Sequence, residues 1–122
     1  MRNLQKVLSV SVLLIAAIPA QEMDLPTFSL DESQAIIEWK INELKSAEIS
    51  EASVTPPKIS IAIKSKSKLE IERFNENFNV DNLYRYAYQP VSKKEGIFTL
   101  FFRKFPAYEL FVSDTKIKFI YE

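Results

Sequence analysis

The stretch from Lys58 to Phe74, KISIAIKSKSKLEIERF, alternates apolar and polar residues. Successive side chains of a strand point to opposite faces, so this pattern predicts β-structure with one face toward a core. The stretch could form one long bent strand or two strands that turn at SKSK, although that turn lacks the residues typical of a hairpin. The apolar positions of one parity are Ile59, Ile61, Ile63, Leu69 and Ile71.

Further strands are predicted after residue 82. The segment IFTLFF, residues 97–102, is apolar on both faces and predicts a central strand that is covered on both sides. Gly96, the only glycine, ends SKKEG and is expected to take a left-handed turn conformation. Residues 75–82, NENFNVDN, are expected to form a loop or a short helical turn. The predicted strands are Leu83–Val91, Ile97–Lys104, Tyr108–Val112 and Thr115–Tyr121, with a tight turn at SDT, residues 113–115.

The region before this sheet has the signature of a helix. The sequence SLDE, residues 29–32, matches a capping box. Leu30, Ile37, Ile41 and Leu44 fall on one narrow arc at helical spacing, which predicts a helix over residues 29–47. Ser, Thr and Pro residues in 48–57 predict a linker. The expected fold class is therefore α+β: one N-terminal helix packed on an antiparallel sheet of about four to six strands over residues 58–122.

The N-terminus has the layout of a cleaved signal peptide. Arg2 and Lys6 precede an apolar run, residues 7–18, which ends before Pro19-Ala20. The run is shorter than the about 20 residues that span a bilayer. Residues 1–20 are therefore predicted to be removed, most simply after Ala20, and an uncleaved anchor is the alternative. Residues 21–28 would be an extended lead-in to a single domain, residues 29–122, and the protein would be exported, periplasmic or secreted.

The composition narrows the possible chemistry. The chain holds no His, no Cys and one Gly. Thiol nucleophiles, imidazole acid–base catalysis and ordinary zinc sites need His or Cys, and phosphate-binding loops need several glycines. We therefore expect a protein that is not an enzyme and has no cofactor. A hydrolase that works with two carboxylates is the third functional hypothesis, after two kinds of binding.

A calcium loop is the one metal site that the sequence suggests. Oxygen-bearing side chains alternate from Asn75 to Asp81. The sixth position of such a loop is not Gly in either register, and the twelfth is Tyr86 or Tyr88 instead of Glu. An Asn-rich turn explains the pattern better, so no metal is expected.

Aromatic residues are the candidates for binding a partner protein. Trp39 lies nearly opposite the apolar stripe of the predicted helix, where an exposed indole would be a good interface anchor. Tyr84, Tyr86 and Tyr88 alternate along a predicted strand and could form an aromatic platform on one face. In each case the alternative is structural: the lead-in or linker covers Trp39, and the tyrosines form a half-buried sheet face.

Charge is unevenly placed along the chain. Residues 21–57 hold eight acidic side chains and two lysines, whereas residues 58–122 hold twelve basic and eight acidic side chains. The near balance argues against a nucleic-acid partner. Lysines on the predicted sheet could still bind a polyanion or a membrane surface, and the alternative is a solvated face that discourages aggregation. The candidates are Lys64, Lys66, Lys68, Lys116 and Lys118. The sequence thus predicts an exported binding domain with a protein partner, and polyanion or membrane-surface binding is the second hypothesis.

Overall fold

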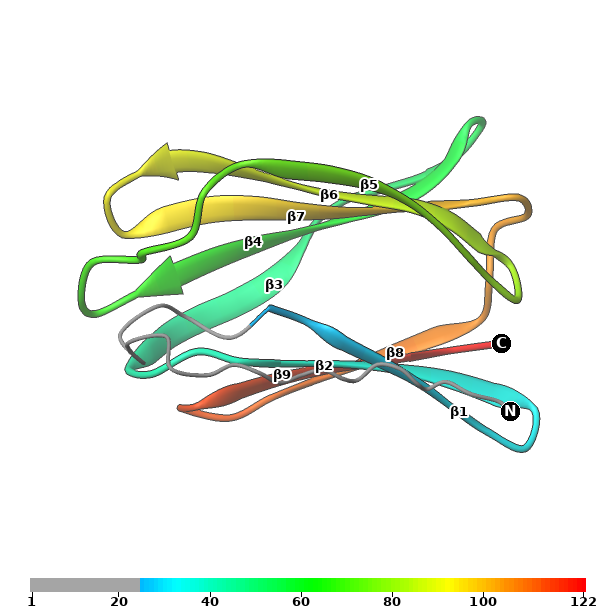
Figure 1. Ribbon diagram of the computed structural model, residues 1–122, viewed down its shortest axis with the longest axis horizontal. Coiled ribbons are helices and arrows are strands. Elements are labelled where there is room, and N and C mark those ends of the chain that lie inside the picture. Colours follow the sequence, from blue (N-terminus) through cyan, green and yellow to red (C-terminus); the bar gives the residue numbers. More distant parts are fainter. Residues whose placement is uncertain (1–24) are drawn as a thin grey trace.

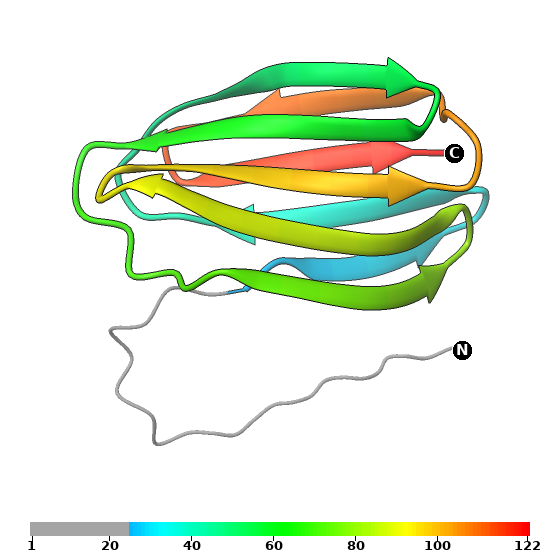
Figure 2. The same cartoon turned by 90° about the horizontal axis from the view of Figure 1, so that it is seen from above.

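A computed structural model describes residues 25–122, which form two antiparallel sheets packed as a β-sandwich (Figures 1 and 2). One sheet has the strand order β1-β2-β9-β8, and the other has the order β3-β4-β7-β6-β5. The predicted signal peptide lies outside the described residues. Within 25–122, no helix has the length and apolarity needed to cross a bilayer. The strands are β1 (Thr27–Asp31), β2 (Gln34–Lys40), β3 (Leu44–Val54), β4 (Pro57–Ser65), β5 (Phe74–Val80), β6 (Leu83–Ser92), β7 (Glu95–Phe102), β8 (Tyr108–Val112) and β9 (Lys116–Tyr121).

The predicted α+β class is wrong, because the segment expected to be a helix, residues 29–47, forms β1, β2 and the start of β3. Ala35, Ile37 and Trp39 are buried, and the residues between them are less so, which is the alternation of a strand. The predicted helical stripe left out Trp39. Because Trp39 is buried together with Ala35 and Ile37, the buried positions repeat every two residues, as in a strand. The capping-box signature is instead a hairpin turn, in which Glu32 has a φ of 58°.

The predicted linker over residues 48–57 is also wrong. Residues 48–54 continue β3, which pairs with β4 along its length. Thr55 and Pro56 alone make the connection between these two strands, because Val54 pairs with Pro57. The two prolines therefore lie at and beside a tight turn rather than in a crossing segment.

The core lies between the inner faces of the two sheets. Ile59, Ile61 and Ile63 of β4 are buried there, as their common parity predicted. Trp39 of β2 reaches across to the opposite sheet, with ring centroids 4.9 Å from Phe98 and 5.5 Å from Tyr88. Such contacts between large aromatic rings stabilise the packing of one sheet on the other.

The later strands follow the sequence prediction closely. β6, β8 and β9 lie within about a residue of their predicted bounds. β7 is central in its sheet as expected, but only one of its faces is buried, so the predicted cover on both sides is wrong. The segment 58–74 follows neither alternative: β4 ends at Ser65, and residues 66–73 form a loop from which Leu69 and Ile71 enter the core. Residues 74–80, expected to be part of a loop or helical turn, form β5.

Gly96 is needed for a reason other than the one predicted. It lies in β7 and its φ is not positive. A Cβ atom at this position would overlap the ring and hydroxyl of Tyr88 on the neighbouring strand β6. The glycine therefore gives space to a buried tyrosine ring, which is the other common use of a glycine inside a strand.

The sandwich has two long sides, each made by one edge strand from each sheet (Figure 2). β3 and β8 lie along one side, and β1 and β5 lie along the other. On the second side Phe28 of β1 packs against Phe78 of β5 and Tyr86 of β6, at centroid distances of 4.5 and 4.9 Å. These rings close the gap between the sheets along part of that side.

Candidate functional site

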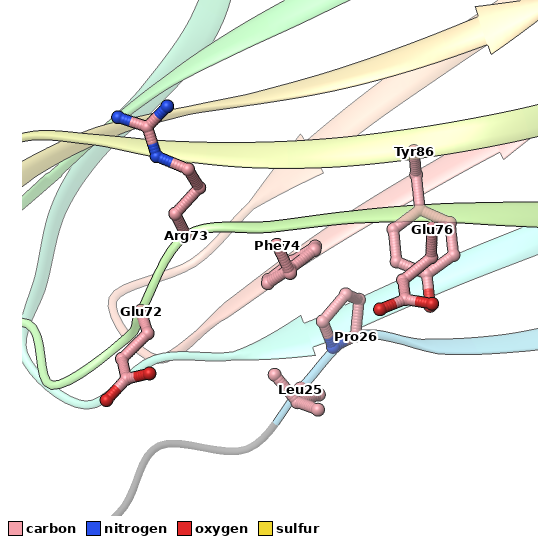
Figure 3. A pocket seen from close by; sticks show the side chains of 7 residues that line it. All are labelled: Leu25, Pro26, Glu72, Arg73, Phe74, Glu76 and Tyr86. Atoms are coloured by element: carbon pink, nitrogen blue, oxygen red, sulfur yellow. The ribbon is translucent and has the colours of Figure 1, made fainter.

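A groove opens on the side of the sandwich where β1 and β5 meet (Figure 3). We call it the β1–β5 groove. Its volume is about 350 Å³, which is in the range of small binding pockets. It is lined by Leu25, Pro26, Glu72, Arg73, Phe74, Glu76 and Tyr86. These residues come from the segment just before β1, the end of the loop 66–73, and the strands β5 and β6.

The floor of the groove is apolar and continuous with the core. Phe74 and Tyr86 are half-buried, and their ring centroids lie 5.6 Å apart. Phe74 also stacks on the buried ring of Tyr88 at 5.7 Å. Leu25 forms part of the wall and remains 62% exposed. The floor is therefore held in place by core packing, while the wall presents apolar surface to solvent.

The rim of the groove carries charge of both signs. Glu72 and Glu76 contribute carboxylates, and the guanidinium group of Arg73 points away from Leu25 and Pro26 (Figure 3). Burial raises the pKa of the Tyr86 phenol, and the nearby carboxylate of Glu76 raises that pKa further. The phenol therefore stays protonated at neutral pH and can donate a hydrogen bond. The groove suits a ligand that has an apolar part beside a cation.

The three tyrosines of YRYAY do not share a face. The register of β6 against β7 shifts between Leu83 and Arg85, and Tyr84 packs beside Phe101, with centroids 6.4 Å apart. Tyr84 is 36% exposed, whereas Tyr88 is buried. The bulge separates Tyr84 from the other two rings. Of the three, only Tyr86 lines the β1–β5 groove.

Trp39 lies in the core, where 1% of its surface is exposed. The sequence argument for Trp39 as an anchor placed it on the outer face of a helix, and that helix is not formed. Its ring instead contacts Phe74 at 6.1 Å, directly behind the floor of the groove. Trp39 therefore supports the site rather than lining it.

The five lysines of the second hypothesis do not form one surface. Lys64 points outward from β4, and Lys66 and Lys68 follow in the loop after it. Lys116 and Lys118 point outward from β9, which belongs to the other sheet. The two groups therefore lie on opposite outer faces of the sandwich. The Nζ atom of Lys116 also lies 3.4 Å from the carboxylate of Glu38, and this carboxylate partly neutralises the charge of the lysine.

The Asn-rich segment does not gather metal ligands. Asn75, Asn77 and Asn79 lie along β5, and the amide oxygen of Asn79 accepts a hydrogen bond from Arg103. Among the described residues there is no group of three or more side chains of the His, Cys, Asp and Glu types that could hold a metal ion.

Sequence reasoning missed most of the groove. Of its lining residues only Tyr86 was singled out, because the loop prediction for residues 75–82 hid the strand that positions Phe74 and Glu76. The available signal was the shared parity of Phe74 and Phe78 in FNENF. Comparison of the chain with family models, with characterised proteins and with solved structures finds no match.

Proposed function

We propose that this chain is an exported, non-catalytic binding domain, and that the β1–β5 groove binds a segment of a partner protein. The observation that carries the proposal is the apolar groove at the meeting point of two edge strands. Phe74 and Tyr86 make a rigid floor there, and Leu25 adds exposed apolar surface. Aromatic floors that are fixed by core packing suit the insertion of a partner's anchoring side chain.

The position of the groove also favours a polypeptide ligand. β5 is the edge strand of its sheet, so one side of its backbone is not paired within that sheet. An extended segment can add to such an edge through main-chain hydrogen bonds while its side chains enter an adjacent pocket. The carboxylates of Glu72 and Glu76 favour a segment in which an apolar residue stands beside a lysine or arginine.

A charge introduced at the groove wall tests this function. Leu25→Glu places a carboxylate on the wall at a residue that is 62% exposed, so the fold should be little affected. The matched control is Val54→Glu, a residue of β3 that is 65% exposed and lies on the other long side. We expect a partner captured from the native host by the unmodified chain to bind Leu25→Glu about tenfold more weakly or worse, because it loses an interface contact.

The captured partner is titrated against the unmodified chain, Leu25→Glu and Val54→Glu, and the three affinities show whether the partner binds at the β1–β5 groove. The proposal requires that Val54→Glu bind within about twofold of the unmodified chain, since surface changes outside an interface have little effect. Equal affinities of Leu25→Glu and the unmodified chain would place the binding site elsewhere. Equal losses in both variants would show that the added charge, not the groove, is responsible.

A further inference from the structure

A second surface arises from the turns at one end of the sandwich. The strands alternate in direction, so the connections β2–β3, β4–β5, β6–β7 and β8–β9 all lie at the same end (Figure 1). Those connections, with the residues beside them, are residues 40–45, 64–73, 92–95 and 113–116. They carry nine basic and five acidic side chains. The opposite end, residues 31–34, 54–57, 80–83, 102–108 and 122, carries two basic and four acidic side chains.

The basic residues are concentrated at one corner of that end. Lys64, Lys66 and Lys68 come from the end of β4 and the following loop, and Lys93 and Lys94 form the turn between β6 and β7. Both figures show these two connections side by side (Figures 1 and 2). We call these five residues the lysine corner. All five are exposed, and none has an ion pair within residues 25–122.

Backbone hydrogen bonds fix the geometry of the corner. The amide of Ser65 donates to the carbonyl of Lys94, and the amide of Leu69 donates to that of Lys93, both at 2.8 Å. The amide of Lys66 donates to the carbonyl of Glu43 in the β2–β3 turn, also at 2.8 Å. The two lysine-bearing segments are thereby held against each other, so ordering the backbone on binding costs little. Lys93 and Lys94 were not among the lysines singled out from the sequence.

We propose that the lysine corner binds the anionic headgroups of a lipid bilayer surface. Like charges held together, with no ion pair among residues 25–122, raise the local positive potential, which attracts a surface of opposite charge. The corner is made of turns at one end of the sandwich, and Val91 beside it is 57% exposed. A basic tip with an exposed apolar side chain fits an anionic bilayer surface. The negative balance at the far end orients the long axis of the sandwich away from that surface.

Binding to vesicles tests the proposal. The probes are large vesicles of neutral phosphatidylcholine, with and without anionic phosphatidylserine. The unmodified full chain should bind the anionic vesicles more tightly, and the difference should shrink as salt is raised. Lys93→Glu with Lys94→Glu should weaken that binding by about 25-fold or more, because each lysine near an anionic surface contributes a factor of roughly five. Residues 1–24 are the same in every protein compared, so a difference between variants is due to the substituted lysines.

Control variants test whether binding depends on the lysine corner itself or only on the net charge of the chain. Lys104→Glu with Lys118→Glu makes the same change of net charge away from the corner and should cost less than about threefold. If the first double variant unfolds, Lys66→Glu with Lys68→Glu replaces it, since both side chains are exposed. Equal losses in corner and control variants would overturn the proposal. Tighter, corner-dependent binding to soluble heparin than to anionic vesicles would also overturn it, in favour of a linear polyanion.

Discussion

At the residue scale, several side chains have roles that depend on a single neighbour. The ring of Tyr88, on the adjacent strand, occupies the space that a side chain at Gly96 would need. Tyr88 in turn stacks on Phe74, the floor of the β1–β5 groove. A change at Gly96 should therefore reach the groove through two aromatic rings, although Gly96 is not a lining residue.

We predict that Gly96→Ala lowers the free energy of unfolding by about 1–3 kcal/mol, because the new methyl group forces the Tyr88 ring out of its place. Denaturant unfolding measures the change. In a Tyr88→Leu background the same substitution should cost much less, since the overlapping hydroxyl and ring atoms are gone. A full cost in both backgrounds would mean that the glycine is required for its backbone conformation instead.

At the element scale, alternation predicted β4 and β9 well, but it also continued through residues 66–73, which form a loop. The prediction of a helix failed where two periods fitted the same residues. Ile37, Ile41 and Leu44 suit a helical stripe, but Ile37, Trp39 and Ile41 suit a strand equally. The buried residues of this segment are Ala35, Ile37, Trp39, Ile41 and Leu44. Short segments of this kind cannot be assigned by periodicity alone. The contact of Trp39 with Phe98 across the sandwich favours the strand over the helix, and the local sequence does not reveal this contact.

The β1–β2 turn provides a test of the element that was assigned wrongly. In the hairpin Glu32 has a φ of 58°, a conformation that glycine adopts without strain. We predict that Glu32→Gly leaves the free energy of unfolding unchanged or raises it by up to about 1 kcal/mol. In a helix the same change would cost about 1 kcal/mol. Thermal unfolding of the variant distinguishes the two, and a clear loss would argue for the helix.

At the scale of the whole molecule, two surfaces of different character meet at the loop 66–73. Its first residues belong to the lysine corner, and its last two, Glu72 and Arg73, line the β1–β5 groove. Neither surface could be assembled from the sequence, because each joins segments from different strands through sheet pairing. Attachment through the corner would hold the groove close to a bilayer, yet Leu25→Glu and Lys93→Glu with Lys94→Glu should impair the two kinds of binding separately.

Residues 34–40 form a strand, β2, and the indole of its Trp39 is buried between the two sheets. The chain has one tryptophan, so fluorescence excited at the long-wavelength edge of indole absorption, where the five tyrosines do not absorb, reports on Trp39 alone. We predict an emission maximum at shorter wavelength than that of free tryptophan and little quenching by iodide in the folded chain, with both features lost on unfolding. Emission like that of free tryptophan, with ready quenching in the native state, would place Trp39 on the surface and contradict the two-sheet fold.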